Sequence, residues 1–384
     1  MDSILIIAGE NSGEKYGADL VRQFKKLHPS FTFFGIGGKH MAKEGVEILF
    51  SVNEFGIVGG FEVLSHLFRI KRIFNQVKNE VKQRQPVASV LIDSPDFNLR
   101  LAKKLKKQSI PILYYISPTV WAWRRGRLKP IKKTIEKMML IFPFEEKIYK
   151  GFKIPAVYVG HPLQEKVRSK LTRQEFLEKY SLDPQKKLIA LLPGSRRSEF
   201  KNHMPVLAKA IHLIKNEWDT HFFLLLAEGL DKKLISDFLP LLPDNLNVLT
   251  ENHYEAIAAS GLVLSACGTA NLEAALLGTP LLAFYRISPL TYSLGRRLAH
   301  IDNFSIVNIL AGKRIIPELI QRDLTPENIF QESKRILESE ETRSEMISHF
   351  RRIKKILGEK TASQNAAKEL QKIIFGDVPQ GATS

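Results

Sequence analysis

The stretch Gly261–Tyr285, GLVLSACGTANLEAALLGTPLLAFY, combines a strand pattern, a glycine turn, a helix pattern and a second strand pattern. Leu262–Ser265 is a short apolar run, typical of a strand that is buried on both faces. Ala270–Leu277 is a run of helix formers, and Thr269 before it is a good N-cap residue. Leu281–Tyr285 is apolar again. The stretch therefore predicts one strand–helix–strand unit of a parallel sheet.

The turn inside this unit predicts an anion site. Gly268 lets a ligand approach the backbone, and the free N–H groups of the first helical turn, at Thr269 and Ala270, attract an anion such as a diphosphate. Glu273 lies one turn further on the same face, where its carboxylate can accept hydrogen bonds from both hydroxyls of a ribose. A diphosphate beside a ribose is a nucleotide, most simply a nucleotide sugar. An ordinary turn with a solvated glutamate explains this window equally well.

Length and composition predict a globular protein with two domains. The chain has 384 residues, more than one ordinary core holds. Hydrophobic residues make up 44% and charged residues 25%, which is an ordinary globular mixture. No apolar run reaches about 18 residues, so no membrane span is expected. The first residues, MDSILIIAGE, have no basic region before the apolar run and are expected to form a strand, not a signal peptide.

Cysteine usage and charge narrow the compartment and the partners. Cys267 is the only cysteine, which excludes a disulfide within the chain and suits a reducing compartment. A small buried residue is favoured there over a nucleophile. The formal net charge of +17 calls for an acidic partner. The basic residues are spread over many predicted helices without a recognisable nucleic-acid module, so a membrane surface and phosphorylated substrates are favoured over nucleic acid.

The first strand, Ile4–Ala8, leads into a glycine-rich turn, GENSGE. Glu10, Ser12 and Gly13 supply a carboxylate, a hydroxyl and a flexible backbone position there. The turn does not read G-x-G-x-x-G, so the dinucleotide fingerprint is absent. Strand and helix patterns alternate from this point, which predicts a doubly wound parallel sheet, and such sheets bind ligands at their carboxyl edge.

A second polar turn follows the predicted strand Val87–Ile92. Asp93, Asp96 and Asn98 place two carboxylates and an amide just past the carboxyl end of that strand. A carboxylate at this edge is well placed to take a proton from an acceptor hydroxyl. The alternative is that Asp96 is only the N-cap of a helix over Leu99–Lys106. The spacing is D-x-x-D, and no D-x-D pattern of a metal–diphosphate site occurs, so no metal and no cofactor are expected.

A greasy and basic helix is predicted within residues 55–81. Its apolar residues cover more than one helical face, with basic residues among them. Such a helix can lie in a membrane interface. The alternative is a helix buried against the sheet on one side, and both hold if the surplus apolar side chains face lipid or an acyl chain. The expected membrane-docking residues are Phe61, Val63, Leu64, Leu67, Phe68, Arg69, Lys71 and Arg72.

An aromatic and cationic loop, SPTVWAWRRGR, follows the predicted strand Ile112–Ile116. Trp121 and Trp123 beside three arginines could hold a sugar face and a phosphate. The alternative is a basic surface loop with one tryptophan in the core. His161 follows near the expected end of the first domain, where a lone histidine is usually structural but can line a cleft.

A second α/β unit begins with the predicted strand Lys187–Leu192 and the turn PGSRRSE. Gly194, Ser195 and Arg196 predict a second anion-binding turn, in which Arg196 neutralises a leaving diphosphate. Arg286 follows a later strand of the same unit and, like Asn98 in the first, is expected to bind substrate. The expected domains are residues 1–165 and 166–345, with a polar crossover helix over 165–183 and a helix over 205–216. Residues 346–384 are expected to form closing helices that pack back on the first domain and end in a frayed tail.

Several segments occur in one order that resembles lipid-A-disaccharide synthases. They are GENSGE, IDSPDFN, YYISPTVWAWRRGR, FPFE, VGHPL, LLPGSRRSE, SACGTANLEAALLGTPLLAFYR and VNILAGKRIIPELIQ. The resemblance covers roughly residues 4 to 330, and the closing helices agree in kind. It implies the GT-B architecture, with two Rossmann-like doubly wound domains, a cleft between them and closing C-terminal helices.

The resemblance also implies a reaction. An inverting, metal-independent hexosyltransferase condenses UDP-2,3-diacylglucosamine with 2,3-diacylglucosamine 1-phosphate, and lipid A disaccharide 1-phosphate and UDP are formed. Such enzymes belong to lipopolysaccharide synthesis in Gram-negative bacteria and sit peripherally on the cytoplasmic face of the inner membrane. A homodimer is left open.

The residues and the resemblance together assign roles. Asp96, in preference to Asp93, takes the proton of the acceptor hydroxyl. Arg196 and the two anion-binding turns offset charge on the leaving UDP, while Glu273 fixes the ribose. The resemblance alone implies that Asn308 and Gln321 contact the donor sugar or phosphate, and Glu10 and Ser12 are expected on the acceptor side.

Two departures from the family pattern leave the acceptor geometry open. The first turn reads S-G-E, with Glu14 where the family usually has aspartate. The helix after Gly268 reads T-A-N-L-E, with Asn271 where a small or hydroxyl residue is commoner. The rival functions are a UDP-sugar 2-epimerase of the same architecture and a non-catalytic, membrane-bound binder of nucleotide sugars.

Overall fold

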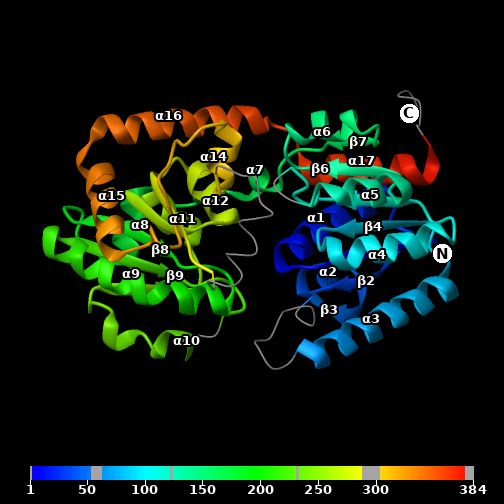
Figure 1. The fold of residues 1–384 in the computed structure, drawn as a ribbon, viewed down its shortest axis with the longest axis horizontal. Helices are drawn as coiled ribbons and strands as arrows, with labels where there is room; N and C mark the ends of the chain where they lie inside the picture. The colour runs from blue at the N-terminus through cyan, green and yellow to red at the C-terminus, as the bar shows by residue number, and fades with distance from the viewer. Residues whose placement is uncertain (1, 53–62, 122–123, 231–232, 288–302, 377–384) are drawn as a thin grey trace. The chain divides into compact units, whose positions relative to one another are not determined.

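A computed structural model describes the chain except for residues 1, 53–62, 122–123, 231–232, 288–302 and 377–384. The side chains of 63–67 also lie outside the described part. The chain divides into two compact units, which are described here one at a time (Figure 1). Unit 1 comprises residues 1–162 and 357–384, and unit 2 comprises residues 163–356.

Unit 1 is built on a seven-stranded sheet in which every neighbouring pair is parallel. The central strands are apolar on both faces and fully buried, as a sheet covered on both sides requires. The strands, in the order β3-β2-β1-β4-β5-β6-β7 across the sheet, are β1 (Ser3–Ala8), β2 (Thr32–Gly37), β3 (Val46–Ser51), β4 (Ala88–Ile92), β5 (Ile112–Tyr115), β6 (Lys137–Leu140) and β7 (Ala156–Tyr158).

The helices of unit 1 form two layers around this sheet. Helix α1 packs against α2 and against α17, which lies beside α1 although it comes from the far end of the chain (Figure 1). Helix α4 packs against α3 and against α5. The helices are α1 (Asn11–Leu27), α2 (Lys39–Lys43), α3 (Val63–Arg84), α4 (Pro95–Lys106), η2 (Arg125–Arg127), α5 (Leu128–Thr134), α6 (Glu145–Gly151) and α17 (Ala362–Phe375).

Unit 2 repeats the plan with a six-stranded parallel sheet. Its order is β10-β9-β8-β11-β12-β13, and the inner strands are again fully buried. The strands are β8 (Lys187–Leu192), β9 (Thr220–Leu225), β10 (Leu246–Leu249), β11 (Leu262–Ala266), β12 (Leu281–Tyr285) and β13 (Glu318–Ile320).

The helices of unit 2 also form two groups. Helix α15 packs on α9, while α11 contacts α8 and α12, and α12 contacts α14. The helices are α7 (Pro162–Lys166), α8 (Arg173–Lys179), α9 (Arg197–Glu217), α10 (Lys233–Ser236), η3 (Leu239–Leu241), α11 (His253–Ala259), α12 (Thr269–Leu277), α14 (Ile306–Ala311), α15 (Pro326–Glu338) and α16 (Glu340–Leu357).

Both sheets reverse their strand order at one place, which is where open α/β sheets bind ligands. In unit 1 this switch point lies between β1 and β4, and in unit 2 between β8 and β11. The four turns that follow these strands are GENSGE, DSPD, PGSRRS and CGT. The four turns singled out in the sequence are therefore the switch-point turns of the two doubly wound units.

Several local expectations differ from the structure. The helix expected over 205–216 begins at Arg197, and Pro205 lies inside it. The crossover expected as one helix over 165–183 is two short helices with a break between them. Edge strand β3 and helix α2 had no counterpart in the sequence reading. The unit boundaries differ from the expected 165/166 and 345/346, most clearly for residues 346–356, which lie with unit 2.

The N-cap expected at Thr269 is also wrong. Gly268 is the N-cap of α12, Thr269 is its first helical residue, and no side chain caps this end. The sequence pattern of residues 292–299 predicts a further helix, but these residues lie outside the described part of the chain.

Candidate active site

The two switch-point turns of unit 1 touch. A Cβ atom added to Gly9, in the turn after β1, would lie 1.9 Å from the Cβ atom of Ser94, in the turn after β4. Only glycine fits at that distance, because any larger residue would push the two turns apart. Gly13 has a packing role as well, since an added Cβ atom would lie 3.2 Å from Cγ2 of Ile92. The turns around Glu10 and Asp93 are thereby held side by side.

The turn after β4 has strained backbone angles and is held by hydrogen bonds from buried side chains. Asp93 and Ser94 have φ values of 49° and 42°, the left-handed region that non-glycine residues seldom occupy. The carbonyl oxygen of Asp93 accepts hydrogen bonds from Nδ2 of Asn98 at 2.7 Å and from the Tyr114 hydroxyl at 2.5 Å. Asn98 also donates to the carbonyl of Ile92 at 3.1 Å and is fully buried. Asn98, expected to bind substrate, thus fixes the backbone that carries Asp93.

Asp96 extends from the first turn of α4 into solvent. Its side chain is 73% exposed, and its Oδ1 atom accepts from Nη2 of Arg127 at 2.9 Å and from Nη1 of Arg124 at 3.1 Å. Arg127 is only 12% exposed, so it is a fixed partner. Asp93 is half-buried beside it in sequence. Asp96 is therefore the more exposed of the two carboxylates of this turn, and two guanidinium groups orient it.

The remaining residues of the first turn divide by burial. Glu10 and Ser12 are exposed at the start of α1. Glu14, the longer residue that departs from the family pattern, is 3% exposed, and its Oε1 atom accepts from the backbone N–H of Met41 at 2.7 Å. Glu14 therefore caps the first turn of α2 and ties it to α1. Its extra methylene group serves the fold, while the ligand edge above it keeps Glu10 and Ser12.

The membrane-docking residues can be followed from Phe68 onward. Phe61 and the side chains of Val63, Leu64 and Leu67 lie outside the described part. Phe68 is 68% exposed, and Arg69, Lys71 and Arg72 are exposed around it. The opposite stripe of α3, at Ile73, Val77 and Val81, is buried in the core. The helix therefore packs on one side and leaves an aromatic ring and three cations on the other.

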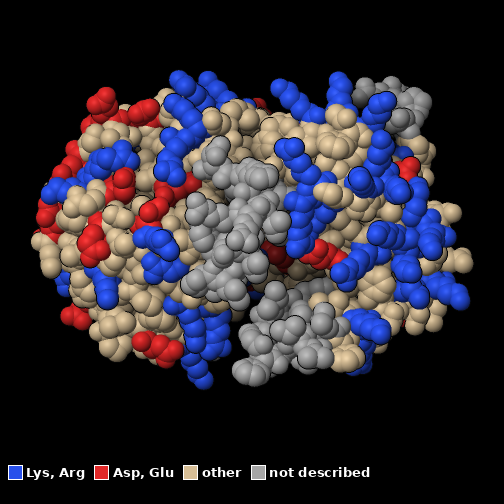
Figure 2. Space-filling model, in the orientation of Figure 1, with Lys and Arg blue, Asp and Glu red and all other residues tan. Residues whose placement is uncertain are grey.

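Positive charge is concentrated in unit 1. This unit carries 30 of the 57 Lys and Arg residues but only 17 of the 40 Asp and Glu residues. Figure 2 shows basic side chains gathered over the face of unit 1 that bears α4 and α5. The exposed ones on these helices are Arg100, Lys103, Lys104, Lys106, Lys129, Lys132 and Lys133. No helix in the described part of the chain has both the length and the apolar character that crossing a bilayer demands.

In unit 2, the turn after β8 is closed by an internal carboxylate. Oε2 of Glu199 accepts from the backbone N–H groups of Ser195 at 3.0 Å and Arg196 at 3.2 Å. Gly194 has φ 131°, and an added Cβ atom would lie 2.6 Å from that of Glu199. Arg196 is 60% exposed and contacts Oε1 of Glu199 at 3.4 Å. The anion-binding geometry expected at this turn exists, and Glu199 occupies two of its donors.

A buried histidine joins this turn to the end of β12. Nδ1 of His203 lies 2.6 Å from the Pro193 carbonyl, and Nε2 lies 2.9 Å from the backbone nitrogen of Arg286. Nδ1 must therefore donate and Nε2 must accept, which defines a neutral ring. Burial lowers the pKa of His203 and favours the same neutral form. Apart from its place one helical turn after Glu199, no sequence pattern singles out His203.

The turn after β11 is open. A Cβ atom added to Gly268 would meet nothing within 4 Å, and its φ of 171° is one that any residue adopts. Neither packing nor backbone geometry within the described chain therefore accounts for a glycine here. Thr269 is exposed and Ala270 half-buried. Glu273, one turn on, is half-buried, and its Oε1 atom accepts from the Tyr254 hydroxyl at 3.4 Å.

Arg286 and Gln321 fasten the ends of β12 and β13. Nη2 of Arg286 donates to the carbonyls of Gln321 at 3.2 Å and of Leu324. Gln321 has φ 56°, and its backbone N–H donates to the carbonyl of Tyr285. Its side-chain amide pairs with the backbone N–H and carbonyl of Ile287 when the amide oxygen faces the N–H. Both residues were expected to bind substrate, and both lie at the carboxyl edge of the sheet. There the Arg286 guanidinium and the Gln321 amide form hydrogen bonds with backbone atoms.

Asn308 is fully buried and uses its whole amide inside the protein. Its Oδ1 accepts from the N–H groups of Ile315 and Ile316 at 2.8 and 3.0 Å. Its Nδ2 donates to the Ile316 carbonyl at 3.0 Å and to Oε1 of Glu318 at 2.7 Å. Asn308 therefore positions α14 and β13. Glu318, which the sequence reading did not single out as a site residue, also accepts from the backbone N–H of Ser305 at 2.9 Å.

The lone cysteine lies beside this network. Burial, with a smaller contribution from Glu318, raises the pKa of the Cys267 thiol well above its usual value, which disfavours a nucleophilic thiolate. Within the described ranges, no three or more His, Cys, Asp and Glu side chains are grouped so as to hold a metal ion.

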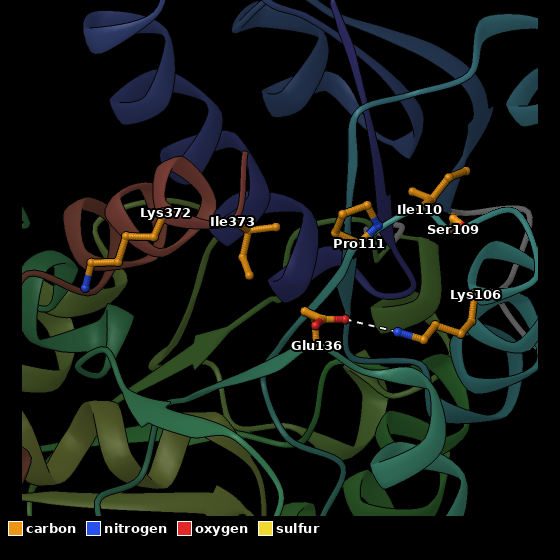
Figure 3. A pocket seen from close by; sticks show the side chains of 7 residues that line it. All are labelled: Lys106, Ser109, Ile110, Pro111, Glu136, Lys372 and Ile373. Atoms are coloured by element: carbon orange, nitrogen blue, oxygen red, sulfur yellow. Dashed lines mark hydrogen bonds and ion pairs between the residues drawn. The ribbon is translucent and has the colours of Figure 1, made fainter. Parts of the chain in front are cut away.

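The two cavities found among the described residues lie at the other edge of the sheets. The one in Figure 3, about 250 Å³, is lined by Pro111 and Glu136, which precede β5 and β6, and by Lys106, paired with Glu136 at 3.2 Å. A second, of about 320 Å³, is lined by residues 313–317 before β13. Both are at amino ends of strands, away from the switch points, so neither belongs to the candidate site.

Comparison with solved structures identifies the architecture. CalG4, the calicheamicin glycosyltransferase, is similar with a TM-score of 0.64 at 13% identity, over 99% of each chain. MurG from Acinetobacter baumannii has a TM-score of 0.56 at 14% identity, over 97% of this chain and 100% of that one. A UDP-GlcNAc 2-epimerase from Neisseria meningitidis has a TM-score of 0.63 at 13% identity, over 96% and 98%. These similarities show the GT-B fold and leave glycosyltransferase and epimerase undivided.

Comparison of sequences distinguishes a glycosyltransferase from an epimerase. A lipid-A-disaccharide synthase from Solibacter usitatus is 36% identical over 98% of this chain and 99% of its own length. One from Geobacter sulfurreducens is 40% identical over 87% and 88%. The family model described as lipid-A-disaccharide synthetase matches residues 4–374. The chain therefore belongs to the lipid-A-disaccharide synthetase family and is a glycosyltransferase.

Proposed function

We propose that the enzyme transfers a diacylglucosaminyl group from UDP-2,3-diacylglucosamine to the 6-hydroxyl of 2,3-diacylglucosamine 1-phosphate. The products are the β(1→6)-linked lipid A disaccharide 1-phosphate and UDP. The attack is in line and inverts the anomeric carbon, and no metal takes part. The observation that carries the proposal is that the family match runs through all four switch-point turns.

On the donor side, we assign UDP to the turns of unit 2. The uncapped N-terminus of α12 at Gly268–Ala270 supplies N–H donors and a favourable helix dipole for the diphosphate. Arg196, 60% exposed and paired with Glu199 at 3.4 Å, is assigned to offset the charge that grows on the leaving phosphate. Glu273 accepts the ribose hydroxyls. His203, Arg286, Asn308 and Gln321 hold the surrounding backbone in place.

On the acceptor side, we assign Asp96 as the general base. It is the more exposed of the two carboxylates, and Arg124 and Arg127 fix its orientation at the first turn of α4. A base in this place accepts the proton of the 6-hydroxyl as the new glycosidic bond forms. Glu10 and Ser12, exposed in the adjoining turn, are assigned to the acceptor.

Both substrates carry acyl chains, so we infer a peripheral site on a membrane surface. Phe68 with Arg69, Lys71 and Arg72 forms an exposed aromatic and cationic patch, which suits an anionic lipid interface. The cytoplasmic face of the inner membrane is the expected location, and a homodimer remains a proposal without a specific surface.

One assay tests the function against its rivals. Purified enzyme is supplied with synthetic donor, with and without the lipid monosaccharide phosphate, and UDP release is followed. The proposal expects UDP and a disaccharide only when both substrates are present. Turnover of the donor alone would indicate an epimerase, and binding of the donor without UDP release would indicate a binder. The family match does not favour either rival.

Two variants test the assigned roles within that assay. Arg196→Ala and Asp96→Asn are each expected to lower kcat about 100-fold or more. Exposed Arg197, next in the chain, gives the matched control Arg197→Ala, which keeps near-normal turnover. Equal losses of kcat in Arg196→Ala and Arg197→Ala would indicate that general surface charge, and not a specific contact of Arg196, supports turnover.

Membrane docking has its own measurement. Co-sedimentation with vesicles that contain anionic phospholipid is expected to fall when Phe68 is changed to Ser, while Phe152→Ser leaves it unchanged. Phe152 is a second exposed phenylalanine of unit 1, 49% exposed, and lies outside the patch. If both variants sediment like the wild type, the patch on α3 does not bind the membrane.

A further inference from the structure

A cluster of buried polar groups lies at the carboxyl ends of β5 and β6 in unit 1, beside the turn that carries Asp96. Glu145, the first residue of α6, is 1% exposed. Ser117, which follows β5, is 7% exposed, and Tyr149, one turn after Glu145, is fully buried. The Ser117 and Tyr149 hydroxyls lie 2.7 Å apart. None of these residues has a role in the proposed reaction.

Two atoms in this cluster have complementary needs. Oε2 of Glu145 and the indole Nε1 of Trp121 are both buried, and neither has a hydrogen-bond partner among the described residues. A buried N–H or carboxyl oxygen without a partner costs about 1–3 kcal/mol. The Trp121 indole and the Ser117 hydroxyl are neighbours of the Glu145 carboxyl and act on its pKa. A donor and an acceptor so placed satisfy each other directly or through one shared water.

Both neighbours belong to the loop that supplies the arginines on Asp96. The described parts of this loop are residues 116–121 and Arg124, which precedes η2, and each part contains a residue with positive φ: Ile116 at 69° and Arg124 at 54°. A β-branched residue in that conformation persists only where its surroundings hold it. Within the loop, the Trp121 ring packs edge-to-face on Phe144 at 5.5 Å. The segment from Phe142 to Tyr149 thus packs against the described part of this loop.

We propose that Glu145 is a positioning residue: its buried carboxyl fixes Ser117 and Trp121, and so sets where the loop places Arg124 and Arg127 on Asp96. The inference rests on the proposed role of Asp96 as the base. It gives the segment FPFE, for which the reaction offered no use, a function through contact with the arginine loop.

Burial favours a neutral Glu145 carboxyl group, and no cation beside it opposes this. The groups that face it are the Ser117 hydroxyl, the Trp121 indole, the Phe142 backbone and the Tyr149 phenol, and none of these is a cation. His161, packed on Phe142, is also held neutral, because burial lowers its pKa to about 3. Burial raises the pKa of Glu145 to about 8, against smaller opposing effects of its neighbours. Near neutral pH, Glu145 is therefore mostly protonated, with its carbonyl oxygen still able to accept from the Trp121 indole, and it gains a charge above about pH 8.

The first test needs no substrate. In a Trp123→Phe, Trp218→Phe background, Trp121 is the only tryptophan, and its emission is recorded from pH 5 to pH 10 on the full chain. A charge formed beside an indole changes its emission, so a transition with a midpoint near pH 8 is expected. Glu145→Gln removes the transition. Glu146→Gln, a change at the exposed neighbour, keeps it. A transition that survives Glu145→Gln, or none in the parent protein, overturns the proposal.

The second test measures turnover against pH. Glu145→Gln, a neutral isostere, keeps kcat near pH 7 and lacks the decline above pH 8 that the wild type shows. Glu145→Ala lowers kcat about tenfold or more at every pH, with circular dichroism confirming the fold. Wild-type kcat in folded Glu145→Ala would overturn the positioning role. A wild type that releases no UDP would instead remove the proposed function, and the emission test would still report on the cluster.

Discussion

The turn after β4 in unit 1 and the turn after β11 in unit 2 use one device for different ends. In each, a fully buried asparagine donates from Nδ2 to the carbonyl of the last strand residue at 3.1 Å, Asn98 to Ile92 and Asn271 to Ala266. In each, the Oδ1 atom of that asparagine has no partner among the described residues. The two units thus close their strand–helix junctions in the same way.

What the junctions present differs. Unit 1 forces Asp93 and Ser94 into left-handed backbone and places carboxylates at the edge. Unit 2 has Gly268 with open space around it and an uncapped helix end. A shared scaffold therefore presents carboxylates in one unit and backbone donors in the other. In the proposed reaction, the first would accept a proton from the alcohol and the second would bind the phosphorylated donor.

The largest expected effect separates the two carboxylates of unit 1. Asp96→Asn is expected to lower kcat about 100-fold or more, because the amide cannot take the proton. Asp93→Asn, at the half-buried neighbour, is expected to lose less. UDP release measures both. The opposite order would move the base to Asp93 and leave the comparison of the two junctions intact.

The open glycine of unit 2 gives the next largest effect. Gly268→Val is expected to raise the donor KM about tenfold or more, because the new side chain occupies the space that the diphosphate needs, and a surface change of this kind costs stability only ~0.5 kcal/mol. Gly278→Val is the matched control at the other end of α12. Its φ of 78° makes a side chain cost about 1–2 kcal/mol, without an effect on KM. An unchanged KM in Gly268→Val would leave this glycine without a function.

The paired asparagines sharpen the comparison directly. Asn98→Ala and Asn271→Ala are each expected to destabilise the protein by about 1–3 kcal/mol, because each leaves a buried carbonyl without its donor. The kinetic effects should differ: Asn98→Ala lowers kcat, and Asn271→Ala raises the donor KM. Thermal unfolding and UDP-release kinetics provide the readouts. The same kinetic change in both variants would contradict separate roles for the two junctions.

The last prediction concerns stability alone, with no effect on the comparison of the two junctions. The folded-state pKa of Glu145 is raised to about 8 from 4.5, so the folded protein holds a proton that the unfolded chain releases above about pH 4.5. Wild-type stability is therefore lost as pH rises from about 4.5 through about 8, by roughly 1.4 kcal/mol per unit of pKa shift. Glu145→Gln lacks this loss. In urea unfolding, the free energy of unfolding of Glu145→Gln relative to the wild type should be higher at pH 9 than at pH 5. The same difference at both pH values would contradict this.

The sequence predicted the alternation of strands and helices because fully buried parallel strands read as short apolar runs between glycine turns. It missed β3 because an edge strand is only half-buried and lacks that signal. It placed the start of α9 at Pro205, where proline is normally a first-turn residue, although the helix begins eight residues earlier, at Arg197. Local pattern cannot show that tertiary packing tolerates the missing hydrogen bond.

The candidate site was read from residues that follow directly after a strand. That rule singled out Asp96, Gly194 and Gly268, whose roles stay proposals. It did not separate ligand-facing side chains from those that hold the turn, so Asn98 and Asn308 were expected at substrate and are buried instead. Glu199 and His203 were not singled out because their roles depend on contacts with segments far away in the chain, such as Tyr285 and Arg286.

The carboxylate of Glu199 has a consequence for how this enzyme handles its leaving group. Because Glu199 already rests on the amides of Ser195 and Arg196, a phosphate that enters this turn swaps one anion for another. The swap yields less net attraction than an empty cradle would. When the product departs, the resident side chain returns and neutralises the donors at once. Such a self-filling turn favours quick turnover over tight retention of the nucleotide.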